Sequence, residues 1–386
     1  MEFAASLSRQ DGLVLGELGS VLIALGIAAY IAAKIRLSVV PIFLFAGLAF
    51  GEGGLVALEL SDEFLDLGAQ WGAILLLLLL GLEYSSKELF DSIKIRRSLG
   101  FVDLVFNFIP GALFALVLGW GLLGALTLGG ITYVSSSGIA SQFIKDSKLE
   151  SKESTKRAVS VLVIEDLFLA PYLPVLSALL ASLGFLSGLI SISIALIITG
   201  IVLLIGARGF HIPHGPHILG DSATLLLTVF GSALLASGVA TYFGFSGAVA
   251  AFLVGLLLTG DIAIVARIRL APLRDLFSAI FFLFFGLSTN PSDIPEILLP
   301  AILLTIVGVL SKLATAWWAV RDLDEVDATW RAAALLIPRG EFSMVIAGLA
   351  ATTVFAVELQ ALTLTYVILT TLISSLIIRT AKSKSS

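Results

Sequence analysis

The stretch Val161-Leu-Val-Ile-Glu165-Asp166-Leu-Phe-Leu-Ala170 places two adjacent carboxylates inside a run that is otherwise apolar enough to cross a lipid bilayer. An acidic side chain at membrane depth costs at least about 2.5–3.5 kcal/mol, so such residues usually have a function. One interpretation is a buried ion pair that only holds helices together. The other, which we favour, is a site where a proton and a metal cation compete for the same oxygens.

The composition around this stretch indicates an integral membrane protein. Hydrophobic residues make up 58% of the 386 residues and charged residues 13%, and the mean hydropathy is +1.06. An ordinary soluble domain is about 45–50% apolar and about 25% charged. The net charge of −5 gives no basic excess that would indicate nucleic-acid binding, and the lack of cysteine excludes disulfides and thiolate chemistry.

Thirteen apolar segments follow one another along the chain, and unbroken apolar runs indicate helices because a helix satisfies its own backbone in lipid. The segments cover about 13–33, 37–50, 66–83, 97–119, 123–143, 157–180, 184–207, 221–237, 241–259, 273–287, 298–319, 331–353 and 361–379. Spanning a bilayer takes about 17–25 residues, so 37–50 and 273–287 are marginal. We predict an all-α polytopic membrane protein with about 13 transmembrane helices.

The basic residues predict the orientation of these helices. With the N-terminus outside, twenty lysines and arginines fall in the cytoplasmic loops and C-terminal tail, against one, Arg9, on the other side. The positive-inside rule therefore predicts a plasma (inner) membrane protein with an extracytoplasmic N-terminus and a cytoplasmic C-terminus. Two further basic residues, Lys312 and Arg339, fall inside helices and need partners there.

Two of the predicted helices are interrupted by residues that weaken a helix. Segment 123–143 contains Gly129-Gly130-Ile-Thr132-Tyr-Val-Ser135-Ser136-Ser137-Gly138, and segment 331–353 contains Pro338-Arg339-Gly340-Glu341-Phe-Ser343. The two segments lie seven helices apart, and an odd offset reverses their direction across the membrane. Paired interrupted helices in an inverted repeat indicate the binding site of a transporter.

Polar groups from four helices are predicted to lie at one level. At about 1.5 Å per helical residue, each lies roughly 9–15 Å from the cytoplasmic face. Neighbours on a helix point about 100° apart, so Glu165 and Asp166 cannot face one partner. We expect Glu165 to pair with Lys312 and Asp166 to bind a proton or an alkali cation. Further hydroxyl ligands, which suit hard cations, are expected from Thr132, Ser135, Ser136 and Ser137. Arg339 and Glu341 are expected either to compensate charge or to satisfy the opened backbone and a neighbouring helix.

A series of short motifs occurs in a fixed order over nearly the whole chain. They are Gly81-Leu82-Glu83, Ser135-Ser136-Ser137, Glu165-Asp166 followed by Pro171, Phe245-Ser-Gly-Ala-Val-Ala-Ala-Phe-Leu-Val-Gly255, Pro272-Leu-Arg-Asp-Leu-Phe277 with Phe281-Phe282 and Gly286, Lys312, and Arg339-Gly340-Glu341-Phe342. In this order they resemble the membrane domain of monovalent cation:proton antiporters of the Kef and NapA kind.

The resemblance implies an NhaA-like inverted-repeat fold in which 123–143 and 331–353 cross as discontinuous helices. It also implies a homodimer with elevator-like alternating access, no enzymatic activity and no cofactor besides the transported Na⁺ or K⁺ and H⁺. The implied parts are a short N-terminus, scaffold helices, a moving core, a linker and a short tail. Their ranges are 1–12 for the N-terminus, 13–96 and 221–297 for the scaffold, 97–180 and 298–380 for the core, 181–220 for the linker and 381–386 for the tail.

Two features depart from the family pattern. The acidic pair is Glu-Asp, where electrogenic members typically carry Asp-Asp and potassium-efflux members Gln-Asp. The sequence also stops at Ser386 without the nucleotide-binding regulatory domain of the potassium-efflux members. Any such control is expected to come from a separate cytoplasmic subunit.

Other interpretations remain open from the residues alone. A sodium-coupled symporter of an organic solute or a cation channel could use a related fold. The Gly244-Phe-Ser246-Gly motif is also found in intramembrane serine proteases, but no base is predicted at its depth. Asp103 is expected to be structural, and Glu83 is expected to be solvated or to cap its helix near the cytoplasmic face. The histidines of the cytoplasmic loop are expected to form a solvated turn, and they are His211, His214 and His217.

Overall fold

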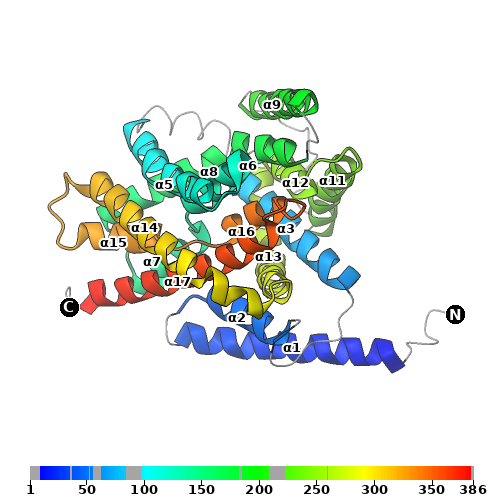
Figure 1. The fold of residues 1–386 in the computed structure, drawn as a ribbon, viewed down its shortest axis with the longest axis horizontal. Coiled ribbons are helices and arrows are strands. Elements are labelled where there is room, and N and C mark those ends of the chain that lie inside the picture. The colour runs from blue at the N-terminus through cyan, green and yellow to red at the C-terminus, as the bar shows by residue number, and fades with distance from the viewer. Residues whose placement is uncertain are drawn as a thin grey trace.

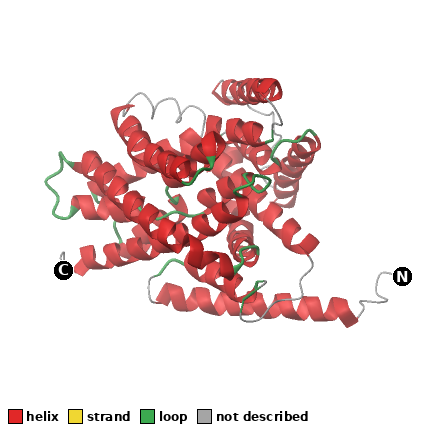
Figure 2. Cartoon of the chain, viewed as in Figure 1, coloured by secondary structure: helices red, strands yellow, loops and turns green. Residues whose placement is uncertain are grey.

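The described residues of this computed structural model form α-helices and one short 3₁₀ helix, with no strand among them (Figures 1 and 2). The structure describes residues 9–34, 37–51, 53–54, 62–83, 97–181, 185–207, 222–258 and 260–383. The histidine-rich loop at 211–217 and the first eight residues lie outside these ranges. The prediction of an all-α fold is confirmed.

Two sets of helices follow one another in the same order, with one helix between them. The first set comprises α1 (Arg9–Lys34), α2 (Val40–Phe50), α3 (Asp62–Glu83), α5 (Arg97–Val117), α6 (Gly121–Tyr133), α7 (Ser137–Ser147) and α8 (Glu153–Leu180). The helix between the sets is α9 (Phe185–Ala207). The second set comprises α11 (Ser222–Tyr242), α12 (Gly247–Leu257), α13 (Asp261–Leu287), α14 (Ile294–Val320) preceded by a 3₁₀ turn at Pro291–Asp293, α15 (Ala328–Leu336), α16 (Glu341–Leu349) and α17 (Ala356–Ser383).

The predicted segments correspond to these helices one by one, when α6 with α7 and α15 with α16 each count as one interrupted span. Eight described spans are long and apolar enough to cross a membrane, and five more apolar helices are shorter. One boundary differs clearly from the prediction. The segment 273–287 is the apolar end of α13, which begins at Asp261 because a polar, arginine-bearing first part continues the same helix.

The helices pack as two groups. In one group, α5, α6, α8, α14, α15, α16 and α17 contact one another, and in the other α2, α3, α11, α12 and α13 do. Helix α9 packs on α8 and α12 at the edge of the molecule, and α1 runs along one side against α2 (Figure 1). Buried apolar side chains from both groups form one continuous cluster, which includes residues of the interrupted helices.

Backbones approach closely where the two halves meet in the second group. A Cβ atom on Gly47 of α2 would overlap the backbone of Gly286 on α13, and one on Gly81 of α3 would overlap the backbone of Gly255 on α12. Small residues allow such approaches between membrane helices. In each contact the second helix of one half meets the third helix of the other half. This exchange supports the repeat.

The loop between α14 and α15 is fastened to the start of α8. Glu325 accepts hydrogen bonds from the backbone N–H of Glu153 at 2.9 Å and from the Ser154 hydroxyl at 2.7 Å. It also forms an ion pair with Arg331 at 3.0 Å. Burial alone would raise the pKa of Glu325, but these hydrogen bonds outweigh it and lower the pKa below its usual value. A carboxylate from the second half thus caps the N-terminus of a helix of the first half.

A second contact between the halves lies at the turns before α6 and before α17. The indole of Trp120 stacks on Phe355, with ring centroids 5.4 Å apart and an interplanar angle of 14°. Its Nε1–H donates to Glu358 at 2.9 Å. The first group of helices is therefore tied together across the halves at two separate turns.

Candidate functional site

Helices α6–α7 and α15–α16 are both broken in the interior, where their extended segments meet (Figure 2). The backbone N–H of Ser136 donates to the carbonyl of Pro338 at 2.8 Å. Ser136 also caps α7 by accepting from the N–H of Ile139. A Cβ atom on Gly340 would lie 2.6 Å from the Ser136 hydroxyl oxygen, so this approach requires glycine. The predicted interruptions are therefore present and contact each other directly.

Arg339 satisfies the carbonyls at the ends of both broken helices. Its side chain is buried, and its Nη2 donates to the carbonyl of Thr132 at 2.7 Å, near the end of α6. Its Nη1 donates to the carbonyls of Leu336 and Ile337 at 2.9 Å each, at the end of α15. The last carbonyls of a helix have no partner within it and carry partial negative charge. The guanidinium therefore stabilises two C-terminal helix ends at once.

Glu341 occupies the opposite electrostatic position. It is the first residue of α16, and its carboxylate accepts a hydrogen bond of 3.0 Å from the hydroxyl of Ser136, the cap residue of α7. Helix N-termini carry partial positive charge. The crossing thus has a cation at its two C-terminal ends and an anion at its two N-terminal ends.

Glu165 of α8 lies fully buried against both the crossing and α14. Its carboxylate accepts from the backbone N–H of Ser135 at 2.5 Å and from the Ser135 hydroxyl at 3.1 Å. It also forms an ion pair of 2.8 Å with the Nζ of Lys312, which is itself fully buried. The pairing of Glu165 with Lys312 that we expected from the sequence is present.

Lys312 has a second carboxylate partner that the sequence analysis missed. Its Nζ lies 2.9 Å from the Oδ1 of Asp103, which is fully buried on α5. The same oxygen accepts from the side-chain amide of Asn107 at 2.8 Å, and that amide donates to Thr315 on α14. Asp103 and Asn107 are spaced i, i+4 on an otherwise apolar helix, so they share one face. That spacing was the available signal for a buried partner.

The other predicted site residues lie around this network. Asp166 follows Glu165 on α8 and is 2% exposed. The hydroxyl of Thr132 bonds to the carbonyls of Asn107 at 2.9 Å and Leu128 at 3.0 Å, so it joins α6 to α5. Ser137 is half-buried at the start of α7. The structure therefore brings the acidic pair, Lys312 and the two breaks together.

Buried, charged groups at the crossing of two broken helices from repeated halves are typical of secondary transporters. Residues 20–382 match the family formed by the transmembrane part of sodium/hydrogen exchangers. The chain belongs to this family. It exchanges a monovalent cation for protons across a membrane. The predictions of the family and of antiport are thereby confirmed, and the symporter is not favoured.

Several curated proteins resemble the chain over most of its length. It is 29% identical over 384 residues to the K⁺/H⁺ antiporter subunit KhtU of Bacillus subtilis, covering 95% of this chain and 93% of KhtU. It is 29% identical to the ammonium/H⁺ antiporter subunit AmhT of Alkalihalophilus pseudofirmus, covering 86% and 85%. The potassium-efflux protein KefC of Escherichia coli is 28% identical, and the chain spans 54% of its length.

The fold also matches a solved structure. The sodium/proton antiporter MjNhaP1 from Methanocaldococcus jannaschii superimposes with a TM-score of 0.68 at 18% sequence identity, covering 94% of this chain and 98% of that one. At this identity the match concerns the fold. It confirms the prediction of an NhaA-like inverted-repeat architecture.

Proposed function

We propose that Asp166 is the residue that binds the proton and the cation in turn, while Glu165 is a fixed partner of Lys312. The observation that carries this proposal is the number of partners that already occupy the Glu165 carboxylate. Glu165 already accepts from Ser135 and Lys312. A carboxylate held in this way has little capacity left for an exchanging ion. The buried neighbour, Asp166, is then the exchangeable group.

The cation is proposed to be Na⁺ or K⁺, bound by hard oxygen atoms next to Asp166. The hydroxyls and carbonyls of the broken segment near Ser135 to Ser137 would supply such oxygens, because Ser135 contacts the neighbouring Glu165. Two relatives that match most of the chain are named for K⁺ and ammonium, and MjNhaP1 for sodium. Potassium is therefore the first cation to test.

Transport is proposed to occur by alternating access of the same site to the two sides of the membrane. The helices from α5 to α8 and from α14 to α17 would form the moving core. The helices α1 to α3 and α11 to α13 would form a scaffold and the interface of a homodimer, with α9 as the link. More extensive packing within each group than between them and the ties across the halves of the core support this division.

We also propose the orientation predicted by the basic residues, with the N-terminus outside the cell membrane and the C-terminus in the cytoplasm. The start of α8 and the α14–α15 loop then lie on the cytoplasmic side. A separate cytoplasmic regulatory subunit is a further part of the proposal. KhtU and AmhT are both named as antiporter subunits, which supports it.

Proteoliposomes that contain a pH-sensitive dye test the role of Asp166. A pulse of K⁺ or Na⁺ should move protons with the wild-type protein, and Asp166→Asn should abolish this movement. Asp324→Asn is the matched control, because Asp324 is an exposed carboxylate of the α14–α15 loop. Wild-type exchange by Asp166→Asn would refute the assignment, and transport that requires an organic solute would favour a symporter.

A further inference from the structure

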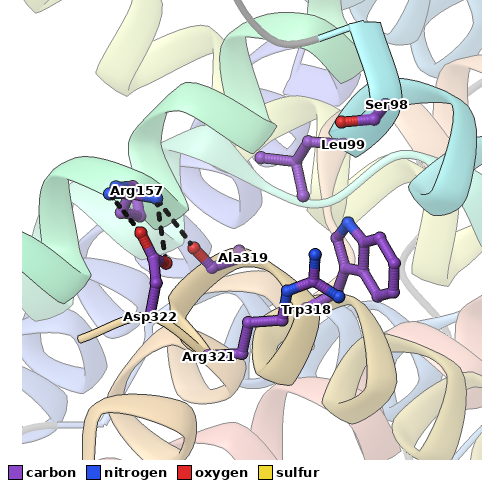
Figure 3. A pocket seen from close by; sticks show the side chains of 7 residues that line it. All are labelled: Ser98, Leu99, Arg157, Trp318, Ala319, Arg321 and Asp322. Atoms are coloured by element: carbon purple, nitrogen blue, oxygen red, sulfur yellow. Dashed lines mark hydrogen bonds and ion pairs between the residues drawn. The ribbon is translucent and has the colours of Figure 1, made fainter. Parts of the chain in front are cut away.

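A cavity of about 460 Å³ lies where the starts of α5 and α8 meet the end of α14 (Figure 3). Its wall includes Ser98 from α5, Arg157 from α8, Trp318 from α14, and Arg321 and Asp322 just after α14. The volume falls within the range of about 300–1,000 Å³ that is typical of small-molecule sites. None of these residues belongs to the network around Glu165.

Arg157 is fixed on one side of the cavity. Its guanidinium forms two hydrogen bonds to the carboxylate of Asp322, at 3.3 and 3.1 Å, and one to the carbonyl of Ala319 at 3.3 Å. Hydrogen bonds from the backbone of Asp322 and from Arg157 lower the pKa of this carboxyl group below its usual value. Arg157 and Asp322 therefore offset each other in charge at neutral pH.

Arg321 supplies positive charge that this pair does not offset. Its guanidinium lies over the indole of Trp318, 3.6 Å from the ring centroid, and among the described residues it forms no ion pair (Figure 3). Stacking on an aromatic ring uses the flat face of the guanidinium. Its N–H donors lie in the plane of the group, so stacking leaves them available for a ligand.

The start of the described part of α5 adds a donor to the same cavity, the hydroxyl of Ser98. It forms one wall of a cavity whose other walls carry two guanidinium groups from different parts of the chain.

We propose that this cavity binds a phosphate group, carried either by an anionic lipid or by a soluble phosphate. Planar guanidinium groups hold phosphate oxygens through paired, charge-assisted hydrogen bonds. In the proposed orientation the cavity lies at the cytoplasmic boundary of the membrane, where tryptophans such as Trp318 are enriched and anionic lipids face the protein. Both sources of phosphate can reach this position.

A phosphate at this place would join three helices that also carry the buried charges. Helix α5 carries Asp103, α8 carries Glu165, and α14 carries Lys312. The ligand would hold the cytoplasmic ends of these helices together. Binding of phosphate is a property separate from ion exchange, so it can be tested in protein that does not transport.

Thermal unfolding of the purified full-length protein tests the proposal in two arms. In detergent, inorganic phosphate is compared with chloride at equal ionic strength. In nanodiscs, phosphatidylglycerol is compared with phosphatidylcholine. We expect the wild-type unfolding midpoint to rise in at least one arm, because a ligand that binds the folded state stabilises it. A rise only with phosphatidylglycerol assigns the site to a lipid headgroup, and a rise with inorganic phosphate assigns it to a soluble phosphate.

Arg321→Gln should weaken this binding roughly tenfold or more, because it removes a charged hydrogen-bond donor. Lys156→Gln is the matched control, since it removes one positive charge from an exposed residue beside Arg157 that does not line the cavity. Each variant's own midpoint without ligand is the baseline, so altered folding does not obscure the result. Arg321→Lys keeps the charge but not the planar donors. It should therefore bind phosphate less tightly than the wild type and more tightly than Arg321→Gln. The absence of any ligand-induced rise in the wild type, or an equal rise in Arg321→Gln, would overturn the proposal.

Discussion

Replacing Lys312 by methionine removes the ammonium group that joins Asp103 to Glu165. All three side chains are fully buried, and the two N–O distances are 2.9 and 2.8 Å. Removal of one partner from a buried ion pair typically costs about 3–5 kcal/mol, because it leaves a charge without compensation. Here one substitution affects two carboxylates, so we expect a loss in the free energy of unfolding at or above that range.

Chemical unfolding of the purified protein, followed by tryptophan fluorescence, measures this loss. The control Lys156→Met removes an exposed lysine and should change stability by less than about 0.5 kcal/mol. The triple variant Asp103→Asn, Glu165→Gln, Lys312→Met should recover most of the stability, because neutral side chains can replace a buried ion pair at little cost. A single variant as stable as the wild type would refute the reasoning. A triple variant as unstable as the single one would show that packing, and not charge, causes the loss.

Three further substitutions test contacts between the halves. Glu325→Gln should lower the unfolding midpoint at neutral pH. Its difference from wild type should shrink as the pH falls from 4.5 through the lower folded-state pKa, because a carboxylate whose pKa is lowered on folding stabilises fully only above its unfolded-state pKa. Gly47→Val should destabilise the protein by about 1–3 kcal/mol or more in chemical unfolding, while Gly200→Val, whose added Cβ meets no atom within 4 Å, should not. Trp120→Phe removes the donor to Glu358 and should cost about 1.5–3 kcal/mol by the same assay; an unchanged value would contradict that hydrogen bond.

The sequence was sufficient for the fold because hydropathy and charge constrain membrane helices strongly. Apolar length located every span, and residues that weaken helices located both interruptions. The pairing of Glu165 with Lys312 followed from a simple requirement, that charges buried at one depth need each other. These features depend on the position of a residue along its helix axis, which the sequence gives directly.

Contacts that depend on the rotation of a helix could not be predicted in the same way. Asp103 was expected to be structural, and its contact with the same ammonium as Glu165 was not predicted. Arg339 was expected to compensate charge or to satisfy opened backbone, but the particular carbonyls that it bonds, at the ends of both broken helices, follow from the crossing geometry. The depth of a residue does not say which neighbour its side chain faces, and a single sequence offers no measure of that angle.

The order of synthesis gives the Asp103–Lys312 contact a consequence for assembly in the cell. The two residues lie 209 positions apart, and Glu165 precedes Lys312 by 147. At about 5–20 residues per second, the ribosome needs on the order of 10–40 s to reach the lysine after it has made Asp103. During the later part of that interval both acids have been synthesised and their base has not. The newly made first half is therefore expected to insert stably only when the second half arrives, and an isolated fragment of α1 to α8 should be a substrate for membrane quality-control proteases.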